Sequence, residues 1–343
     1  MKLTRVGVDL AKNVFQVHGV DRAERAIWCK RLKRNHWIEE IEQNVEPGTE
    51  IGMEACGSSQ HWGRVLQSKG YVVRLIAPQF VKPYVKTNKH DAADAEAICE
   101  AMSRPNMRFV GVKTIEQQDM QAVHRVRSSL IKERTAKANQ IRGFMYERGL
   151  VAPRELFALR RALPGWLEDA SNGLTPQFRA LLSGLYEDLR RLDERVNELD
   201  EELLAIAREH EAVRRLEQLR GIGLLIASAL YALVGDARQY KNGRALAVAL
   251  GLTPRQHSTG GKKRLLGISQ RGDAYVRTLM IHGARSALRT ASGKEDRLSR
   301  WVVALAKRSH PNVAATALAN KMARVAWAML RHGTNYEPDR LAA

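Results

Sequence analysis

A heptad repeat of apolar side chains in the middle of the chain constrains the fold more than any other feature. Thr175-Pro176 is typical of a helix start, with a capping residue followed by proline at the first helical position. From there apolar residues recur with spacings that alternate between four and three: Phe178, Leu182, Leu185, Leu189, Leu192, Val196, Leu199, Leu203 and Ile206. This spacing predicts a long coiled-coil helix.

A second long helix is predicted from the capping box at Thr114 and Gln117 to about Arg148. The heptad pattern does not decide whether the two long helices pair with each other or with another subunit. Its regularity over four repeats exceeds what one short hairpin requires, so we expect part of it to serve oligomerisation. Between the two helices, Pro164 and Gly173 predict shorter helices separated by turns.

The segments on either side of the long helices predict two different kinds of domain. Near the N-terminus, apolar runs and turn residues predict strands at 4–9, 14–19, 26–30, 50–55 and 71–76, and helices at 39–44, 59–69 and 91–104. The C-terminal part predicts helices at 244–250, 273–290, 301–308 and 312–331. The fold class is therefore α/β plus all-α, with an α/β domain (1–112), a coiled-coil region (113–212) and a helical domain (213–343).

The charge of the chain indicates a polyanionic partner. A net charge of +19 and a pI near 10.2 favour nucleic acid, with an anionic membrane surface as the alternative. No stretch approaches the roughly 20 apolar residues that span a bilayer. The opening residues do not resemble a signal peptide, and the isolated Cys29, Cys56 and Cys99 fit a reducing cytoplasm better than a zinc site.

Four acids in the N-terminal domain have unusual positions. Asp9 and Glu54 each end a predicted strand, and Asp91 and Asp94 begin a predicted helix on one face. Carboxylates at strand ends project into the crevice where α/β sheets bind ligands. If the four converge, divalent cations between them would relieve their repulsion, and two Mg²⁺ ions suit oxygen ligands and phosphates. The alternatives are that Asp91 caps its helix and Asp9 is a turn residue.

The segment 251–273 interrupts the helical half of the chain. Pro254, Gly260, Gly261, Gly267 and Gly272 exclude a continuous helix. Two hydroxyl residues lie among cations and a histidine in this segment: Ser258 and Thr259, with Arg255, His257, Lys262, Lys263 and Arg264. The motif is neither a Walker loop nor a nucleophile elbow. It predicts either a phosphate-binding loop or an activated hydroxyl, with His257 as a candidate base.

Two other elements are candidates for nucleic-acid contact. The helix from Thr114 carries a dense basic face that includes Arg127 and Arg134, which is either solvated or rests on a nucleic-acid backbone. Gly221-Ile-Gly223 looks like the turn of a helix-hairpin-helix element, whose backbone amides can hold a phosphate. The alternative for this turn is a simple connection between helices.

Taken in order, these motifs resemble those of the insertion-sequence-110 transposases. The resemblance rests on Gly7-Val-Asp9-Leu-Ala-Lys, Met53-Glu54-Ala, Asp91-Ala-Ala-Asp94-Ala, Gly221-Ile-Gly223, Gly251-Leu-Thr-Pro254, His257-Ser-Thr-Gly-Gly261 and Ser269-Gln-Arg-Gly272. The His-Ser-Thr-Gly-Gly form is similar to the 1111 subgroup, and Piv-type invertases share the pattern. The match covers nearly the whole chain.

The resemblance implies a function and a set of partners. The N-terminal domain would be RuvC-like, of the RNase H type, and would bind Mg²⁺ or Mn²⁺ at Asp9, Glu54, Asp91 and Asp94. A serine of the C-terminal domain would attack DNA and become joined to it. A non-coding guide RNA (a bridge RNA) would pair with donor and target DNA, and dimers would assemble into tetramers in the bacterial cytoplasm, at the nucleoid.

The resemblance also leaves one choice between two residues. Many relatives have serine directly before the loop glycine, where this chain has Thr259, but alignment from the downstream side gives Ser258 the nucleophile's place. We expect Ser258, with Thr259 as the alternative. Gln270 replaces a lysine of the family motif, beside Arg271, a further candidate contact to nucleic acid. The other functions to be excluded are a metal-only nuclease of the junction-resolvase type and a non-catalytic scaffold.

Overall fold

The computed structural model describes residues 2–86, 90–152 and 154–338. The chain forms two compact units. Unit 1 consists of Met1–Gln117, Val234–Ala249 and Leu330–His332, and unit 2 consists of Gln118–Leu233, Leu250–Met329 and Gly333–Ala343.

Unit 1 is built on a six-stranded mixed sheet with the order β3-β2-β1-β4-β5-β6. The strands are β1 (Arg5–Leu10), β2 (Val14–Val20), β3 (Ala26–Lys33), β4 (Glu50–Glu54), β5 (Val72–Ile76) and β6 (Phe109–Val110). The first three are antiparallel neighbours, whereas β4 is parallel to both β1 and β5. The five predicted strands are confirmed, and β6 was not predicted because two residues carry no detectable period.

The helices of unit 1 also agree with the prediction. They are α1 (Trp37–Asn44), α2 (Ser59–Ser68) and α4 (Asp91–Met102), with short turns at α3 (Pro78–Val81) and η1 (Lys82–Tyr84), and with η2 (Ala237–Gln239) and α10 (Gly243–Ala249) from later in the chain. The core is built mainly from apolar and aromatic side chains, and Phe15, Trp37 and Trp62 meet edge to face with ring centroids 5.0 to 5.7 Å apart.

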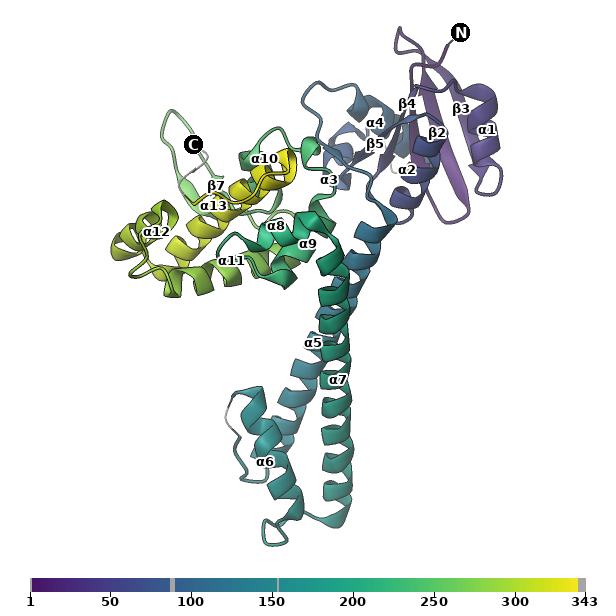
Figure 1. Cartoon of the computed structure of the whole chain (residues 1–343). Helices are drawn as coiled ribbons and strands as arrows, with labels where there is room; N and C mark the ends of the chain where they lie inside the picture. Colours follow the sequence, from purple (N-terminus) through teal and green to yellow (C-terminus); the bar gives the residue numbers. More distant parts are fainter. Residues whose placement is uncertain (1, 87–89, 153, 339–343) are drawn as a thin grey trace. The chain divides into compact units, whose positions relative to one another are not determined.

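Unit 2 contains the two long helices, α5 (Ile115–Tyr146), which begins in unit 1, and α7 (Pro176–Glu209). They run side by side (Figure 1). The predicted capping box of α5 is confirmed in both directions, because Thr114 N–H donates to Gln117 Oε1 and Gln117 N–H donates to Thr114 Oγ1. The Thr175 cap of α7 is confirmed as well, since its side chain accepts from Phe178 N–H.

The heptad seam of α7 is covered within the same chain. All seam residues are buried except Leu192 and Ile206, which are partly buried. The first half of the seam packs against Ile141 and Met145 of α5 and against Leu159 and Leu163 of α6 (Leu156–Glu168). The long helices therefore pair with each other, and the oligomerisation predicted for part of the seam has no exposed apolar seam to support it.

The break expected at Pro164 is wrong, because α6 continues through this residue. A proline inside a helix removes one backbone hydrogen bond and costs about 3 kcal/mol. Leu159 and Leu163 are both fully buried against the long helices. Their packing on one face of α6 offsets the cost of the proline.

The remaining helices of unit 2 follow the prediction closely. They are α8 (Glu211–Glu217), α9 (Leu224–Val234, of which Val234 belongs to unit 1), α11 (Ala274–Arg289), α12 (Arg297–Arg308) and α13 (Pro311–His332, of which Leu330–His332 belong to unit 1). The strands β7 (Pro254–Gln256) and β8 (Leu265–Ile268) form a separate two-stranded sheet. Among the described residues, no helix has the length and apolar character needed to cross a membrane.

Candidate functional site

Asp9 and Glu54 occupy neighbouring positions near the carboxyl ends of two parallel strands. The register of β1 and β4 pairs Val8 with Met53, so the next residue on each strand is one of these acids. Neighbouring strands lie about 4.8 Å apart, and matched positions point to the same face. Burial raises the pKa of the Cys56 thiol, and the nearby charges of Glu54 and Asp9 raise it further. The two carboxylates therefore share one local environment.

Helix α4 covers the sheet face to which these two acids point. A Cβ atom at Gly7, two residues before Asp9 on the same face, would lie only 2.3 Å from the backbone oxygen of Ala95. Arg5 Nε donates to the Cys99 oxygen at 3.0 Å, so α4 runs opposite to β1. The path from Arg5 to Asp9 is about 13 Å along a strand, and the path from Cys99 to the first residue of α4 is about 12 Å along a helix. Asp9 and the first turn of α4 therefore lie at the same end of this face.

Asp91 and Asp94 lie in that first turn of α4, as the sequence predicted. The alternative that Asp91 caps the helix is wrong. His90 is the capping residue, and its Nδ1 accepts the Ala93 N–H at 3.2 Å. Asp91 is exposed and Asp94 is partly buried. Neither side chain caps the helix, so both carboxylates are available to bind a ligand.

The predicted convergence of all four carboxylates is not seen. Within the described part of the chain, no three histidine, cysteine, aspartate or glutamate side chains lie close enough to hold one ion. Like charges repel at short range, which favours separation of the acid pair on the sheet from the pair on α4. Mg²⁺ commonly takes only one or two carboxylates and fills its other positions with water and phosphate. The donor chemistry of Asp9 and Glu54 therefore fits a divalent cation.

Ser258 and Thr259 lie in an exposed β-hairpin, where the sequence had predicted an irregular loop. Thr259 forms a bridge with Lys262, and Lys262 N–H donates to the Thr259 oxygen at 3.0 Å. Gly260 and Gly261, with φ of +54° and +77°, supply the two central residues of this tight turn. Two residues in the left-handed region match the twist of a hairpin. The strands were missed because both of their faces are exposed, so they lack apolar alternation.

The hydroxyl of Ser258 is held by two donors. Gln256 Nε2 donates to Ser258 Oγ at 2.9 Å, and the backbone N–H of Arg264 lies 3.4 Å from the same oxygen. Donors aimed at an oxygen stabilise negative charge as it develops there. Within the described residues, no hydrogen bond joins the His257 ring to Ser258 Oγ. The structure thus does not support His257 as the base for Ser258.

Positive charge is concentrated on this hairpin and its base. The cationic side chains are all exposed, and the segment from Pro254 to Ile268 contains no acid. Within the described residues, none of the cations predicted to contact nucleic acid here forms an ion pair: Arg255, Lys262, Lys263, Arg264 and Arg271. Their charges remain available to a phosphate backbone.

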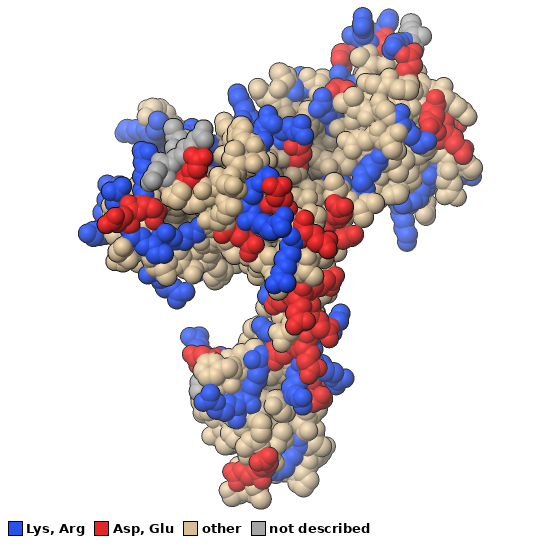
Figure 2. Space-filling view, viewed as in Figure 1, with Lys and Arg blue, Asp and Glu red and all other residues tan. Residues whose placement is uncertain are grey.

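Arg127 and Arg134 were predicted to be either solvated or in contact with a nucleic-acid backbone, and the structure shows neither environment. Arg127 pairs with Asp200 of α7, with one N–O distance of 3.1 Å, and Arg134 pairs with Asp193 at 3.1 Å. The arginine side chains are only 13% and 22% exposed. They are neither solvated nor on a free basic face, because acids of α7 neutralise them. Figure 2 shows acidic side chains gathered along α7.

The turn at Gly221 and Gly223 connects α8 to α9, as predicted. A Cβ atom at Gly221 would lie 2.7 Å from the oxygen of Gly283 on α11, so the turn packs tightly on that helix. This contact alone requires glycine at position 221. Gly223 is exposed, with nothing near its Cα that a side chain would meet. Phosphate binding by this turn stays a prediction.

A buried network around His124 was not recognised from the sequence. His124 Nδ1 lies 3.0 Å from Tyr275 Oη, and Nε2 lies 3.0 Å from Ser228 Oγ. Ser228 donates to the Leu224 oxygen at 2.8 Å, so its oxygen accepts from Nε2–H, and Tyr275 then donates to Nδ1. The only sequence signal was a histidine three residues, or about one helical turn, before Arg127 on α5. Burial, helped by the charge of Arg127, lowers the pKa of His124 to about 4.

This pKa predicts a pH dependence of stability. The unfolded chain binds the His124 proton near 6.5 and the folded chain only near 4, so acidification favours unfolding between these values. The loss should reach about 3 kcal/mol at pH 4. Denaturant unfolding of the wild type and His124→Gln from pH 7 to 4 should show a shallower decline in the variant. His36→Gln, on an exposed histidine, should decline like the wild type. Parallel curves for His124→Gln and the wild type would contradict the assignment.

Comparison with known proteins covers both parts of the chain. Residues 6–147 match the IS110-type DEDD model described as "Transposase", and residues 213–299 match the model described as "Transposase IS116/IS110/IS902 family". A "Probable family 20 transposase" of Pseudomonas aeruginosa is 50% identical over 98% of this chain and 100% of its own length. The "Transposase for insertion sequence element IS1111A" of Coxiella burnetii is 45% identical over 96% of this chain and 90% of its own. A third relative, the "Transposase for insertion sequence element IS1328" of Yersinia enterocolitica, is 39% identical over 97% and 98%.

These matches agree with an α/β unit that carries paired acids and a helical unit that carries a basic hairpin. Together they define a DNA-processing enzyme of the transposase class. The chain belongs to the IS110 family of transposases.

Proposed function

We propose that this transposase is an RNA-guided DNA recombinase that cuts and rejoins DNA through a covalent link to Ser258. Unit 1 would act as a RuvC-like domain of the RNase H type. Its three antiparallel leading strands, followed by two parallel strands with acids at the ends of β1 and β4, support this assignment. The hairpin of unit 2 would bring the serine to a phosphate.

The observation that carries the proposal is the position of Ser258. Its oxygen is exposed at the edge of an acid-free, cationic hairpin, and Gln256 and Arg264 N–H both donate to it. Surrounding cations favour a phosphate, and the two donors favour an anionic oxygen. Within the described residues, neither of these donors reaches the Thr259 hydroxyl, and the bridge that closes the turn uses only the backbone of Thr259. This contrast supports Ser258 over Thr259 as the nucleophile.

The reaction would conserve one phosphodiester bond. Ser258 Oγ attacks the scissile phosphorus and loses its proton, a bond forms between Oγ and phosphorus, and the bond from phosphorus to a deoxyribose oxygen breaks. The released deoxyribose oxygen takes up a proton. In the rejoining step another deoxyribose hydroxyl attacks the phosphoserine and frees Ser258. Because bond energy stays in the phosphoserine, no nucleotide hydrolysis is needed.

The four acids would supply the electrostatic part of the site. Asp9 and Glu54 from the sheet, with Asp91 and Asp94 from α4, would hold Mg²⁺ or Mn²⁺. When bound, such a cation neutralises charge on the scissile phosphate. The positions of all four acids at one end of one sheet face support this role. The family's DEDD type suggests divalent metal as well.

Guide RNA and DNA would be the two polyanionic partners. A net charge of +19 supports binding of more than one nucleic-acid molecule, and the basic hairpin supports DNA contact near Ser258. Assembly of two or four subunits would let the hairpin of one chain meet the acids of another.

Sequencing RNA that co-purifies with the full chain tests the guide. We expect one enriched non-coding RNA with segments complementary to donor and target DNA. A random sample of cellular RNA would contradict RNA guidance, but it would not contradict the role of Ser258.

One other function has a specific observation in its favour. Among the described residues, no carboxylate or ring nitrogen accepts a hydrogen bond from Ser258 Oγ. A metal-dependent nuclease of the junction-resolvase type would need no such base, because water attacks and Ser258 only binds phosphate. Such an enzyme would leave no protein on the DNA, so the presence or absence of a covalent protein–DNA species separates the two functions.

A further inference from the structure

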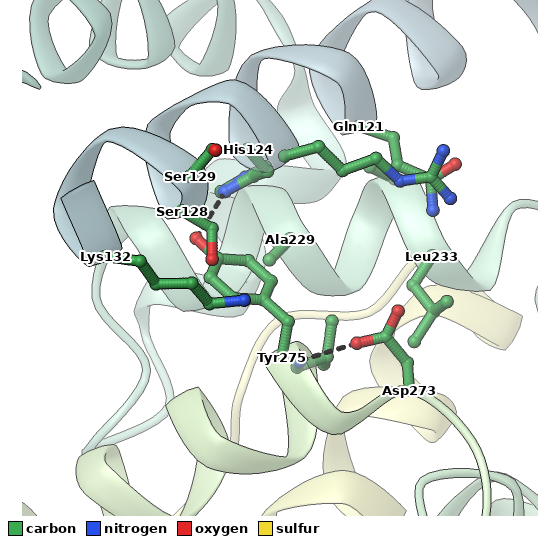
Figure 3. A pocket seen from close by; sticks show the side chains of 12 residues that line it. Gln121, His124, Ser128, Ser129, Lys132, Ala229, Leu233, Asp273 and Tyr275 are labelled. Atoms are coloured by element: carbon green, nitrogen blue, oxygen red, sulfur yellow. Dashed lines mark hydrogen bonds between the residues drawn. The ribbon is translucent and has the colours of Figure 1, made fainter.

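Unit 2 contains a pocket that none of the steps above uses. It has a volume of about 230 Å³ and lies between α5, α9 and the start of α11. Figure 3 shows polar side chains of α5, among them His124, Ser128 and Lys132, beside the Tyr275 ring, with Ala229 and Leu233 of α9 next to them. The pocket is smaller than the roughly 300–1,000 Å³ of sites for drug-sized ligands. Its size suits one small flat group.

The rim of the pocket carries positive charge that the protein does not neutralise. Arg125 and Lys132 lie seven residues apart on α5 and both line the pocket. Both are exposed, and neither has an ion pair within the described residues. The opposite situation holds for Arg127, Arg134 and Lys137, which pair with acids of α7. Helix α5 therefore divides its charge between an internal face and a face that is free for an anion.

The buried side of the pocket is apolar, whereas polar and charged side chains form the rest of its lining. Ala229 and Ala232 of α9 and Val276 of α11 are buried and line the bottom. The Tyr275 ring is held by its hydroxyl, which bonds His124. His124 is uncharged at neutral pH, because burial lowers its pKa to about 4. The one carboxylate of the lining, Asp273, accepts the Val276 N–H at 2.9 Å and caps α11. An aromatic wall beside an apolar floor favours a planar ring over a bare phosphate.

We infer that this pocket binds one unpaired nucleotide of a nucleic-acid strand, with its base against Tyr275 and the floor of α9 and its phosphate at Arg125 and Lys132. Aromatic stacking beside cations is the usual way in which proteins hold a single unpaired base. The pocket belongs to the helical unit and uses none of the residues assigned to cutting and rejoining. It would fix the register of a bound strand at an unpaired position.

The test uses the full chain and two probes that differ by one nucleotide. One probe is a DNA duplex with a single bulged 2-aminopurine, and the other is the same duplex fully paired around 2-aminopurine. A matching RNA pair distinguishes the source of the nucleotide. We expect the fluorescence of the bulged base to fall on binding in at least one of the two nucleic acids, as it does when the base stacks on an aromatic ring.

Two variants and their controls separate the pocket from general charge. Ser128→Leu should fill the pocket and weaken binding of the bulged probe about tenfold or more, with little change for the paired probe. Thr135→Leu places the same side chain on an exposed part of α5 and should bind like the wild type. The double variant Arg125→Ala/Lys132→Ala should weaken binding of the bulged probe. The double variant Lys307→Ala/Arg308→Ala removes the same charge from α12 and should weaken this binding less.

Each outcome decides the inference. Unchanged fluorescence with all probes, or equal binding by Ser128→Leu and Thr135→Leu, would overturn it. Equal losses for bulged and paired probes would show a backbone contact instead of a nucleotide pocket. Circular dichroism of each variant checks folding. Ser258→Ala should retain the bulged-probe signal, so failure of this inference and failure of the proposed chemistry give different results.

Discussion

Ser258→Ala is expected to abolish both recombination and the covalent protein–DNA species while leaving DNA binding intact. The variant lacks the oxygen that would form the bond to phosphorus, and no other hydroxyl occupies the position that Gln256 and Arg264 N–H support. Removing a nucleophile from a cooperating site commonly lowers the rate by on the order of 10⁴-fold or more. Recombination of a two-plasmid substrate measures the loss, and denaturing gels detect the linked species.

Thr259→Ala is the matched control, because it removes a neighbouring hydroxyl from the same hairpin. Its backbone bridge to Lys262 does not depend on the side chain. We expect it to retain the linked species and recombination within about tenfold of the wild type, since surface substitutions of this kind cost little stability. Loss of the linked species in Thr259→Ala, with its retention in Ser258→Ala, would transfer the assignment to Thr259.

Glu54→Gln and Asp9→Asn form the second large-effect prediction. Each change keeps the size of the side chain and removes one of the paired charges at the ends of β4 and β1. We expect recombination to fall by at least about 10³-fold, because a neutral amide holds a divalent cation far more weakly than a carboxylate does. Both variants should keep the thermal stability of the wild type within a few degrees.

The control for this pair is Glu39→Gln, an exposed acid in the first turn of α1 that is not one of the four acids. It should recombine like the wild type. Chelation of divalent ions should reproduce the loss in the wild type, and added Mg²⁺ should restore activity. Full activity of Asp9→Asn would favour a role for unit 1 as a scaffold and would contradict the assignment of the acids.

The fold of unit 1 could be predicted because its strands are buried and bounded by turn residues. Val6, Val8, Ile51 and Met53 are fully buried, and buried strands give continuous apolar runs. The long helices could also be predicted, from their capping residues and from the heptad seam. In contrast, β7 and β8 are exposed on both faces, so no period marked them.

The parts of the site that escaped prediction depend on contacts between distant residues. Arg127 and Asp200 are 73 residues apart, and only the pairing of α5 with α7 shows that this arginine is neutralised within the chain. The network of His124 requires Tyr275, 151 residues away. Likewise, the two donors to Ser258 depend on the register of the hairpin. Motifs located the acids and the serine, but their neighbours became visible only in three dimensions.

The most direct test of the covalent mechanism is mass spectrometry of the protein after reaction with a donor DNA substrate. The reaction is stopped with denaturant, the DNA is digested, and the peptide that spans residues 255–262 is fragmented. We predict a nucleotide attached through phosphate to Ser258, dependent on Asp9 and Glu54. An unmodified peptide from a reaction that has cut the DNA would contradict the covalent mechanism and favour attack by water.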